Sequence, residues 1–454
     1  MLNFLKRLIS PATSPVPSMP PSKILQSADK AKIDGYEAPA ATGAEEGTPL
    51  RRHAKLIMVT AANNNKFYEM KENGDGTFTA YYGRVGSSSS TATYPMSKWG
   101  SKLREKVRKG YADQTHLFAE DSSATDFADI PDAVVRGLIE DLLKYSRQSI
   151  LRNYNVAADQ VTRKQVEQAQ AILDKLAGKV KLRLHLNKFN QDLVALYTLI
   201  PRRMTKVADH LIERPSTQED LKKIEKKLAE EQATLDVMRG EVEAHEQQKA
   251  QQPGEKQTLT QALGIQVEPL TDAALIKSIK KMMGRDSGKF HRAFKVANAR
   301  TQQSFDEYVG NSKNKTTELF WHGSRNENWL SILKTGLVLR PANAIVTGKM
   351  FGYGLYFADK FRKSLNYSSV RGSFWAGGTS GNGFLALYDV HLGMPLKIKR
   401  HAAWCSQLTE EKLKKRGSKY NSVFAKGGAD LINNEYIVYN QAQCTVRYLV
   451  EVHA

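Results

Sequence analysis

Apolar and polar side chains alternate in short segments between residues 55 and 114. LIMVTA is followed by KFYEMKENGDGTFTAYYGRVG, in which Asn73 to Gly76 supply the residue types of a hairpin turn. A basic segment over residues 96–110 comes next and predicts a helix. We therefore expect a small β-rich unit closed by one helix.

The apolar spacing becomes helical between residues 130 and 252. Residues 161–176 and 189–199 carry apolar side chains three and four positions apart, which predicts a bundle of amphipathic helices. The last helix is expected to start at Ser216, with Glu219 completing a capping box, and to stop at Pro253. A coiled-coil dimer is the competing interpretation of this helix, although few heptads are available.

The pattern is mixed after residue 258. The segments FLALYDVHLG, EYIVYN and CTVRYLVEVH are apolar-rich and partly alternating, which predicts a largely antiparallel sheet rather than a doubly wound one. The fold class expected for the whole chain is therefore α+β, divided into several domains.

Composition narrows the choice of partners. The chain has 454 residues, enough for about three domains, and its net charge of +20 suits a phosphate-rich partner, with simple solubility as the alternative. Only Cys405 and Cys444 are present, which excludes a disulfide framework, an iron–sulfur cluster and a cysteine-based zinc finger. Because no run of eighteen apolar residues occurs, we expect a soluble protein with no membrane partner.

Residues 1–50 are expected to form a disordered basic leader. Pro, Ser and Ala dominate this segment, and few bulky apolar groups are available to offset the entropy of ordering. Its first acidic residue is Asp29, which fits a mitochondrial presequence. A basic arm that samples DNA fits the same composition, so both interpretations stay open.

Three segments carry the most specific pattern. The chain has no P-loop, HExxH, GxSxG or GxGxxG motif, but it contains LFWHGSRNENWLSILKTGL, VTGKMFGYGLYFADKFRKSLNY and NNEYIVYNQAQ in that order. Together these segments resemble the catalytic domain of the poly(ADP-ribose) polymerase family.

The resemblance extends over most of the chain. It implies a WGR-like DNA-binding domain over residues 51–118, a helical regulatory domain over residues 128–252 and an ADP-ribosyltransferase domain over residues 258–454. The catalytic motifs are highly specific, whereas the match to the WGR domain is weaker. The substrate implied is NAD, used as a co-substrate, with no metal ion.

Four positions match the part of the family site that holds the adenosine side of NAD and the amide of nicotinamide. His322 matches the histidine that binds the adenosine ribose, and Gly323 matches the glycine whose backbone holds the nicotinamide amide. A glycine suits that role because a residue without Cβ lets a ligand approach the main chain closely. Ser324 and Asn328 match residues of the same NAD-binding loop.

Three further positions match the nicotinamide slot. Tyr367 matches the ring that stacks on nicotinamide, Tyr356 the tyrosine on its other side, and Ser364 the hydroxyl that holds the carboxamide. A slot between aromatic rings favours a flat ligand through burial of apolar surface. Taken singly, such tyrosines are more often part of a core.

Glu435 matches the catalytic glutamate, and Lys363 matches a lysine near the transferred ribose. Cleavage of the bond between nicotinamide and ribose builds positive charge on the sugar, which a fixed carboxylate stabilises. The same carboxylate can bind a ribose hydroxyl and activate an acceptor. A lone His or Glu is usually structural or solvated, but three segments in the family order favour the functional interpretation.

The expected DNA contacts lie in the first unit. Tyr82 replaces the tryptophan that names the WGR motif and is followed by Gly83 and Arg84. A tyrosine can stack on a sugar or base, and an arginine can contact phosphate. The basic helix adds Lys98 and Lys102. Arg84 as a plain surface charge is the alternative.

The function expected from the resemblance is that of a DNA-break-activated poly(ADP-ribose) polymerase. Its partners would be nicked or 5′-phosphorylated DNA ends and acceptor proteins including itself, and its location the nucleus, or the nucleoid in a prokaryote. Residues 402–421 look unlike the family's loop around the acceptor site, so transfer of single ADP-ribose units stays open. A catalytically silent scaffold that binds DNA ends is the alternative from another class.

Overall fold

The computed structural model describes most of the chain beyond residue 51. The described residues are 52–85, 88–115, 128–156, 158–181, 183–249, 257–339, 350–370, 372–373, 376–377 and 380–454. From His53 to Ala454 they belong to one unit of contacting elements. The expected leader lies outside the described residues.

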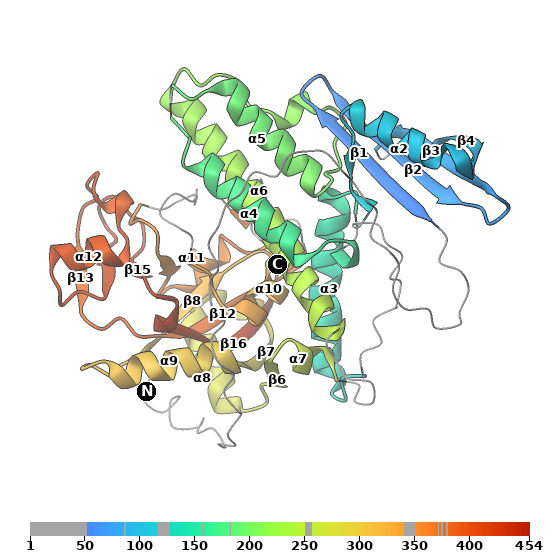
Figure 1. Ribbon diagram of the computed structural model, residues 1–454. Coiled ribbons are helices and arrows are strands. Elements are labelled where there is room, and N and C mark those ends of the chain that lie inside the picture. The colour runs from blue at the N-terminus through green and yellow to red at the C-terminus, as the bar shows by residue number, and fades with distance from the viewer. Residues whose placement is uncertain are drawn as a thin grey trace. The chain divides into compact units, whose positions relative to one another are not determined.

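A five-stranded antiparallel sheet, here the N-terminal sheet, begins this unit, with strand order β4-β3-β2-β1-β5. Glycines at positive φ in the β2–β3 turn, Gly74 and Gly76, fit the predicted hairpin. Alternate side chains such as Phe78 are fully buried under Trp99 of the covering helix α2, which lies across one face of the sheet (Figure 1). The elements are β1 (His53–Thr60), β2 (Asn64–Glu72), β3 (Thr77–Arg84), β4 (Ser90–Pro95), α2 (Trp99–Arg108) and β5 (Ala112–Asp113).

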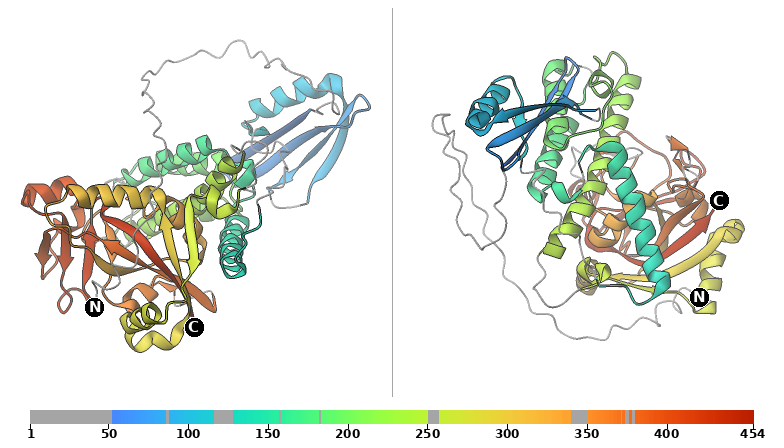
Figure 2. Two further views of the ribbon diagram at one scale, coloured as in Figure 1. Left: turned by 90° about the horizontal axis from the view of Figure 1, so that it is seen from below. Right: turned by 90° about the vertical axis from the view of Figure 1, so that its right-hand side faces the viewer.

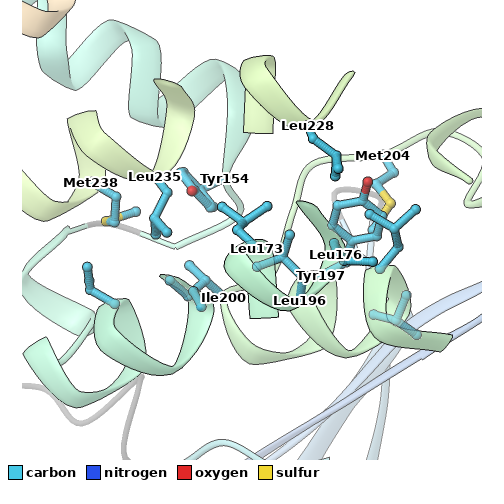
Figure 3. Packing of buried hydrophobic residues seen from close by; sticks show 14 of the residues in the cluster. Tyr154, Leu173, Leu176, Leu196, Tyr197, Ile200, Met204, Leu228, Leu235 and Met238 are labelled. Atoms are coloured by element: carbon cyan, nitrogen blue, oxygen red, sulfur yellow. The ribbon is translucent and has the colours of Figure 1, made fainter. Parts of the chain in front are cut away.

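Four long helices form a bundle. Asp132 caps the first helix, and Thr162 forms a capping box with Gln165 at the second, so donors at both helix starts are satisfied. Figure 3 shows side chains from several of these helices interdigitating in a continuous apolar core, with Leu173 and Tyr197 near its centre. The helices are α3 (Ala133–Asn153), α4 (Arg163–Ala177), α5 (Leu186–Leu199) and α6 (Gln218–Lys249).

Helix α6 differs from the sequence prediction in two respects. Its capping box joins Thr217 to Asp220: the Thr217 N–H donates to Asp220 Oδ2 over 3.0 Å, and the Asp220 N–H donates to Thr217 Oγ1 over 3.1 Å. The predicted pair Ser216–Glu219 was therefore wrong by one residue. The coiled-coil dimer was also wrong, because Leu228 is buried inside this chain and α6 packs against α3, α4 and α10.

The described part of residues 257–454, here called the C-terminal unit, contains two larger sheets. The main sheet has strand order β6-β7-β16-β12-β8, and the second has order β13-β14-β15-β9. All pairings in both sheets are antiparallel except β13 with β14. The strands are β6 (Ile265–Pro269), β7 (Phe290–Asn298), β8 (Glu318–Gly323), β9 (Leu355–Phe357), β12 (Asn382–Val390), β13 (Pro395–Ile398), β14 (Ser422–Ala425), β15 (Glu435–Val438) and β16 (Cys444–His453).

Shorter elements connect and flank these sheets, and α9 and α8 run beside the main sheet (Figure 2). Two short strands, β10 (Gly372–Ser373) and β11 (Ala376–Gly377), form a separate antiparallel pair. The helices are α7 (Leu259–Ala262), α8 (Ala273–Met283), α9 (Ala299–Asn311), α10 (Trp329–Thr335), α11 (Phe361–Leu365) and α12 (Glu410–Arg416). The 3₁₀ helices are η1 (Met96–Lys98), η3 (Ala158–Gln160), η4 (Ala208–His210), η5 (Gly284–Lys289), η6 (Asn326–Asn328), η7 (Cys405–Gln407) and η8 (Gln441–Gln443).

The predicted α+β, multidomain class is confirmed by this arrangement of helices and antiparallel sheets. The domain boundaries themselves stay a prediction. Across the described ranges, we find no helix that combines the length and the apolar character needed to span a bilayer.

Candidate active site

The two sheets of the C-terminal unit enclose a cavity of about 470 Å³ at the end of β8, here the β8 cavity. All nine residues that the sequence predicts for NAD binding and catalysis line it, although they come from four separated segments. These residues are His322, Gly323, Ser324, Asn328, Tyr356, Lys363, Ser364, Tyr367 and Glu435.

Strand pairing explains why such distant residues meet. β15 pairs with β9, so Ile437 lies opposite Tyr356 and Glu435 lies at the near end of the same pair. An isolated bridge between Trp321 and Ala358 then ties β9 to β8 of the main sheet. The cavity therefore sits where the two sheets meet, and its position depends on buried backbone hydrogen bonds.

Glu435 and Lys363 form the charged centre of the cavity. Lys363 Nζ lies 2.6 Å from Glu435 Oε1 and also donates to the Asn434 carbonyl over 3.0 Å. Burial lowers the pKa of Lys363, and the Glu435 carboxylate opposes that shift. Glu435 Oε2 is buried without a hydrogen-bond partner in the described part of the chain. A buried carboxylate oxygen of this kind is available to a ligand hydroxyl.

His322 is held in one orientation at the end of β8. Its Nδ1 lies 3.0 Å from the Tyr356 carbonyl, which fixes the ring and leaves Nε2 available to a ligand. Burial lowers the pKa of His322, although the hydrogen bond to that carbonyl acts in the opposite direction. The neutral imidazole is therefore favoured near pH 7.

The two cavity tyrosines differ in their surroundings. The Tyr356 hydroxyl donates to the Gly352 carbonyl over 2.8 Å and accepts from the Phe351 N–H over 3.1 Å, and burial raises its pKa. Tyr367 lines the same cavity with 53% of its surface exposed. One ring is thus fixed in the wall, whereas the other lies at the open side.

Gly323 makes room for the protein's own backbone. A Cβ at this position would lie 2.0 Å from the Ser364 carbonyl oxygen, so the close approach is to the protein's own backbone. The predicted close approach of a ligand to the Gly323 backbone stays a prediction. Its absent side chain also allows β8 to pack against α11, which carries Lys363 and Ser364.

One wall of the cavity was not predicted from the sequence. Helix α6 contributes Gln232, Asp236 and Arg239, which line it together with the β8 and β9 residues. Arg239 donates to Gln170 Oε1 of α4 over 2.6 Å, so this wall is tied to the bundle. The amphipathic pattern of α6 marks its buried face, but no sequence signal distinguishes core positions from cavity positions.

The C-terminal unit is similar in sequence to known proteins. Residues 274–454 match the model of the poly(ADP-ribose) polymerase catalytic domain. Poly [ADP-ribose] polymerase 2 of Zea mays is 26% identical over 86% of this chain and 68% of its own length. The poly [ADP-ribose] polymerase-like protein 100L of Invertebrate iridescent virus 6 is 31% identical over 36% of this chain and 88% of its own length.

The chain belongs to the poly(ADP-ribose) polymerase family. This confirms the family and, for the C-terminal unit, the NAD-dependent ADP-ribosyltransferase class that the sequence predicts. Not every relative is spanned to the same extent. The chain covers 65% of protein 101L of the same virus, at 33% identity, so the activity of a whole relative is not carried over directly.

The residues predicted to bind DNA come from the N-terminal sheet and from η1 and α2. The Tyr82 ring stacks on Tyr68 at 5.9 Å between centroids and is 38% exposed. Lys102 lies 3.2 Å from Glu105 and over the Tyr94 ring, whereas Lys98 is exposed at the start of α2. Tyr82 and Lys102 therefore each contact a tyrosine ring of the sheet, Tyr68 and Tyr94 respectively.

Gly83 and Arg84 contact other parts of the chain, Gly83 the Ser88 backbone and Arg84 Asn63 and the bundle. Gly83 packs closely against the Ser88 carbonyl, with 3.1 Å to an added Cβ. The Arg84 guanidinium donates to the Asn63 carbonyl and to Asn63 Oδ1, each over 3.0 Å, and to the Thr205 carbonyl of the bundle. Asn63 Oδ1 also accepts from the Val207 N–H over 2.9 Å. Arg84 thus joins the N-terminal sheet to the bundle.

Proposed function

We propose that this chain is a DNA-break-activated poly(ADP-ribose) polymerase. It cleaves NAD, releases nicotinamide and transfers ADP-ribose to protein side chains and to growing ADP-ribose chains. The observation that carries the proposal is the 2.6 Å contact between Glu435 and Lys363 inside a cavity that also contains His322 and both tyrosines.

Glu435 supplies the catalytic charge in this proposal. Loss of nicotinamide leaves positive charge on the ribose, and a preorganised carboxylate stabilises that charge more than the ground state. Oε1 is held by Lys363, so Oε2 is the oxygen that would accept from a ribose hydroxyl. Lys363 would hold the carboxylate next to the sugar through this contact.

The remaining residues bind the two ends of the dinucleotide. Tyr356 and Tyr367 would enclose the nicotinamide ring, with the Gly323 backbone and the Ser364 hydroxyl on its amide. His322 would bind the adenosine ribose through Nε2, because Nδ1 is already engaged by the Tyr356 carbonyl. Asn328 donates to Ser324 Oγ over 3.0 Å, which would order the loop next to the adenosine.

In this proposal, helix α6 restricts the NAD site until DNA binds. Its residues Ala229, Gln232, Ala233, Asp236 and Arg239 line the β8 cavity in this conformation, so the helix would restrict access to the NAD site. Gly240 packs on α10 so closely that a Cβ would lie 2.8 Å from Ser331 Cβ. DNA binding at the N-terminal sheet would loosen this contact through the bundle. A bundle that only spaces two domains is the alternative.

The partners follow from the same proposal. Nicked or 5′-phosphorylated DNA ends would bind the N-terminal sheet, and protein acceptors, including this chain, would enter at the Glu435 side of the cavity, in the nucleus. The divergent segment 402–421 folds into η7 and α12, and the Arg416 guanidinium stacks 3.3 Å from the centre of the Trp404 ring. Because this segment differs from the family pattern, product length needs direct measurement.

Substitution of Glu435 by Gln tests the proposal. The change removes charge and little shape, so NAD binding should persist while polymer formation falls by about 100-fold or more. Labelled NAD is incubated with the chain, with and without nicked DNA, and products are sized on a gel. The matched control is Glu307→Gln, which removes an exposed carboxylate on α9. Unchanged polymer length in Glu435→Gln would refute the assigned role.

A further inference from the structure

Three side chains with metal-binding chemistry meet at one end of the main sheet, outside the β8 cavity. His291 lies on β7, and Glu451 and His453 lie on β16. One ligand atom from each of these three residues lies within 4.8 Å of the other two. None of the three is among the residues that line the β8 cavity, so the function proposed above does not use them.

Strand geometry explains the meeting. Glu451 and His453 are two positions apart on one strand, so their side chains leave the same face of the sheet. The register between β7 and β16 shifts between Glu451 and Val452, next to the partner Arg292. This irregularity brings His291 against His453, and their rings stack at 4.1 Å with an interplanar angle of 19°.

Glu451 is held in the way that a metal-binding carboxylate is usually held. It is buried, with 3% of its surface exposed, and its Oε2 accepts from Arg292 Nε over 2.6 Å. Its Oε1 accepts from Asn382 Nδ2 over 3.1 Å and lies 3.7 Å from His453 Nε2. Hydrogen bonds from outside the ligand set fix the orientation of a ligating carboxylate and leave further acceptor capacity on Oε1.

We propose that His291, Glu451 and His453 form a binding site for one divalent transition-metal ion, with Zn²⁺ as the best match. Two imidazoles and a carboxylate suit zinc, whereas Ca²⁺ and Mg²⁺ prefer oxygen ligands alone. Water would fill the fourth position. Both histidines are exposed, so their rings can rotate to the roughly 2.0 Å bonds that zinc needs.

Metal binding at this site would also stabilise a contact with helix α3 of the bundle. The Asn382 side chain that donates to Glu451 accepts, through Oδ1, from the Tyr145 hydroxyl of α3 over 2.6 Å. An ion bound to Glu451 would therefore stabilise both the β7–β16 end of the sheet and the contact with α3. Because the unfolded chain lacks the assembled site, zinc should raise the melting temperature of the protein.

Direct binding measurements test the site without reference to catalysis. The tag-free full chain is freed of metal with a chelator and titrated with Zn²⁺ in a calorimeter, and with Co²⁺ by visible absorption. We expect one ion per chain and the absorption bands of Co²⁺ bound to nitrogen and oxygen ligands. The variants His291→Ala and His453→Ala should each lower the affinity about tenfold or more.

The matched control is His185→Ala, which removes an exposed histidine at the start of α5. This variant should bind zinc as the unmodified chain does. Buried Cys405 and Cys444 do not compete for the ion. Melting curves without metal check that each histidine variant folds. A chain that takes up no zinc, or a His291→Ala/His453→Ala double variant that binds as tightly as the unmodified chain, overturns the proposal.

Discussion

The residues predicted for function are arranged differently in the β8 cavity and on the N-terminal sheet. In the cavity, all nine predicted residues come together, and its central charges, Glu435 and Lys363, are paired 2.6 Å apart. On the N-terminal sheet, the predicted residues are spread over β3, η1 and α2, and Arg84 is engaged by Asn63 and by the bundle.

The difference follows from burial. A buried charged or polar side chain must have a partner, so the residue types and their surroundings constrain one another. An exposed lysine or arginine has water as its alternative partner, and its sequence context says little about its contact. Motifs in a buried site are therefore far more informative than basic residues on a surface.

Gly323→Ala is expected to produce the largest effect and tests the buried side of this comparison. The added Cβ would meet the Ser364 carbonyl at 2.0 Å, so β8 and α11 must move apart and Lys363 and Ser364 move with α11. We expect activity with labelled NAD to fall by about 100-fold, since a shift of about 1 Å in a catalytic group can cost that much.

Gly381→Ala is the matched control, because a Cβ there has no described atom within 4 Å. Its activity and melting temperature should stay at the level of the unmodified chain. If Gly323→Ala also stays fully active, the close backbone contact is not needed to position the NAD site.

Arg84→Ala tests the exposed side and should have a smaller effect. Because the guanidinium bonds within the chain, its loss should lower stability by about 1–2 kcal/mol and weaken the stimulation of activity by nicked DNA. The dependence of DNA affinity on salt should change little. Lys98→Ala, which removes an exposed cation on the same unit, should reduce that slope by about 0.9.

Fluorescence titrations of a nicked duplex at several salt concentrations separate the two interpretations of Arg84. A slope that falls by about one unit in Arg84→Ala would make this residue a phosphate contact, as the sequence suggested. An unchanged slope with weaker stimulation would support its role as the link between sheet and bundle.

Much of the fold could be predicted because periodicity reports burial directly. The β2–β3 hairpin, helices α4 and α5, and strands β12, β15 and β16 lie where the alternation and the helical spacing place them. The start of α6 could not be predicted to the residue, because Ser216, Thr217, Glu219 and Asp220 offer two equivalent capping patterns. Only the geometry of the helix start selects the second pattern.

Site residues that stand in a sequence motif could be predicted. Site residues that reach the cavity only through packing could not. His322 and Glu435 stand in specific segments, so their meeting was expected. Gln232 and Asp236 of α6 line the same cavity, but they stand in a helix whose polar positions all look alike. Likewise, the link from Arg84 to Thr205 joins positions 121 residues apart and leaves no local pattern.

One partly buried and one buried carboxylate extend the comparison to stability, with the smallest expected effect. In the N-terminal sheet, burial would raise the pKa of Glu69, but hydrogen bonds from His53 and Lys55 outweigh it and lower the pKa to about 2. In α6, burial raises the pKa of Glu241, and the hydrogen bond from Ser146 offsets this only in part. The Glu69 contribution is lost as pH falls, whereas the Glu241 contribution is lost as pH rises.

Glu241→Gln should therefore stabilise the chain at pH 8 and have little effect in acid. The amide keeps an acceptor for the Ser146 hydroxyl and removes the cost of a buried charge, so the gain should be about 1 kcal/mol or less, or roughly 2 °C in melting temperature. Glu69→Gln is the opposing control, because it removes a charge that His53 and Lys55 stabilise, and it should destabilise the chain at pH 8. Thermal unfolding from pH 5 to pH 8 measures both variants. Equal pH dependence in Glu241→Gln and the unmodified chain would contradict a raised pKa of Glu241, because a carboxyl group whose pKa is higher in the folded than in the unfolded state makes stability fall as pH rises.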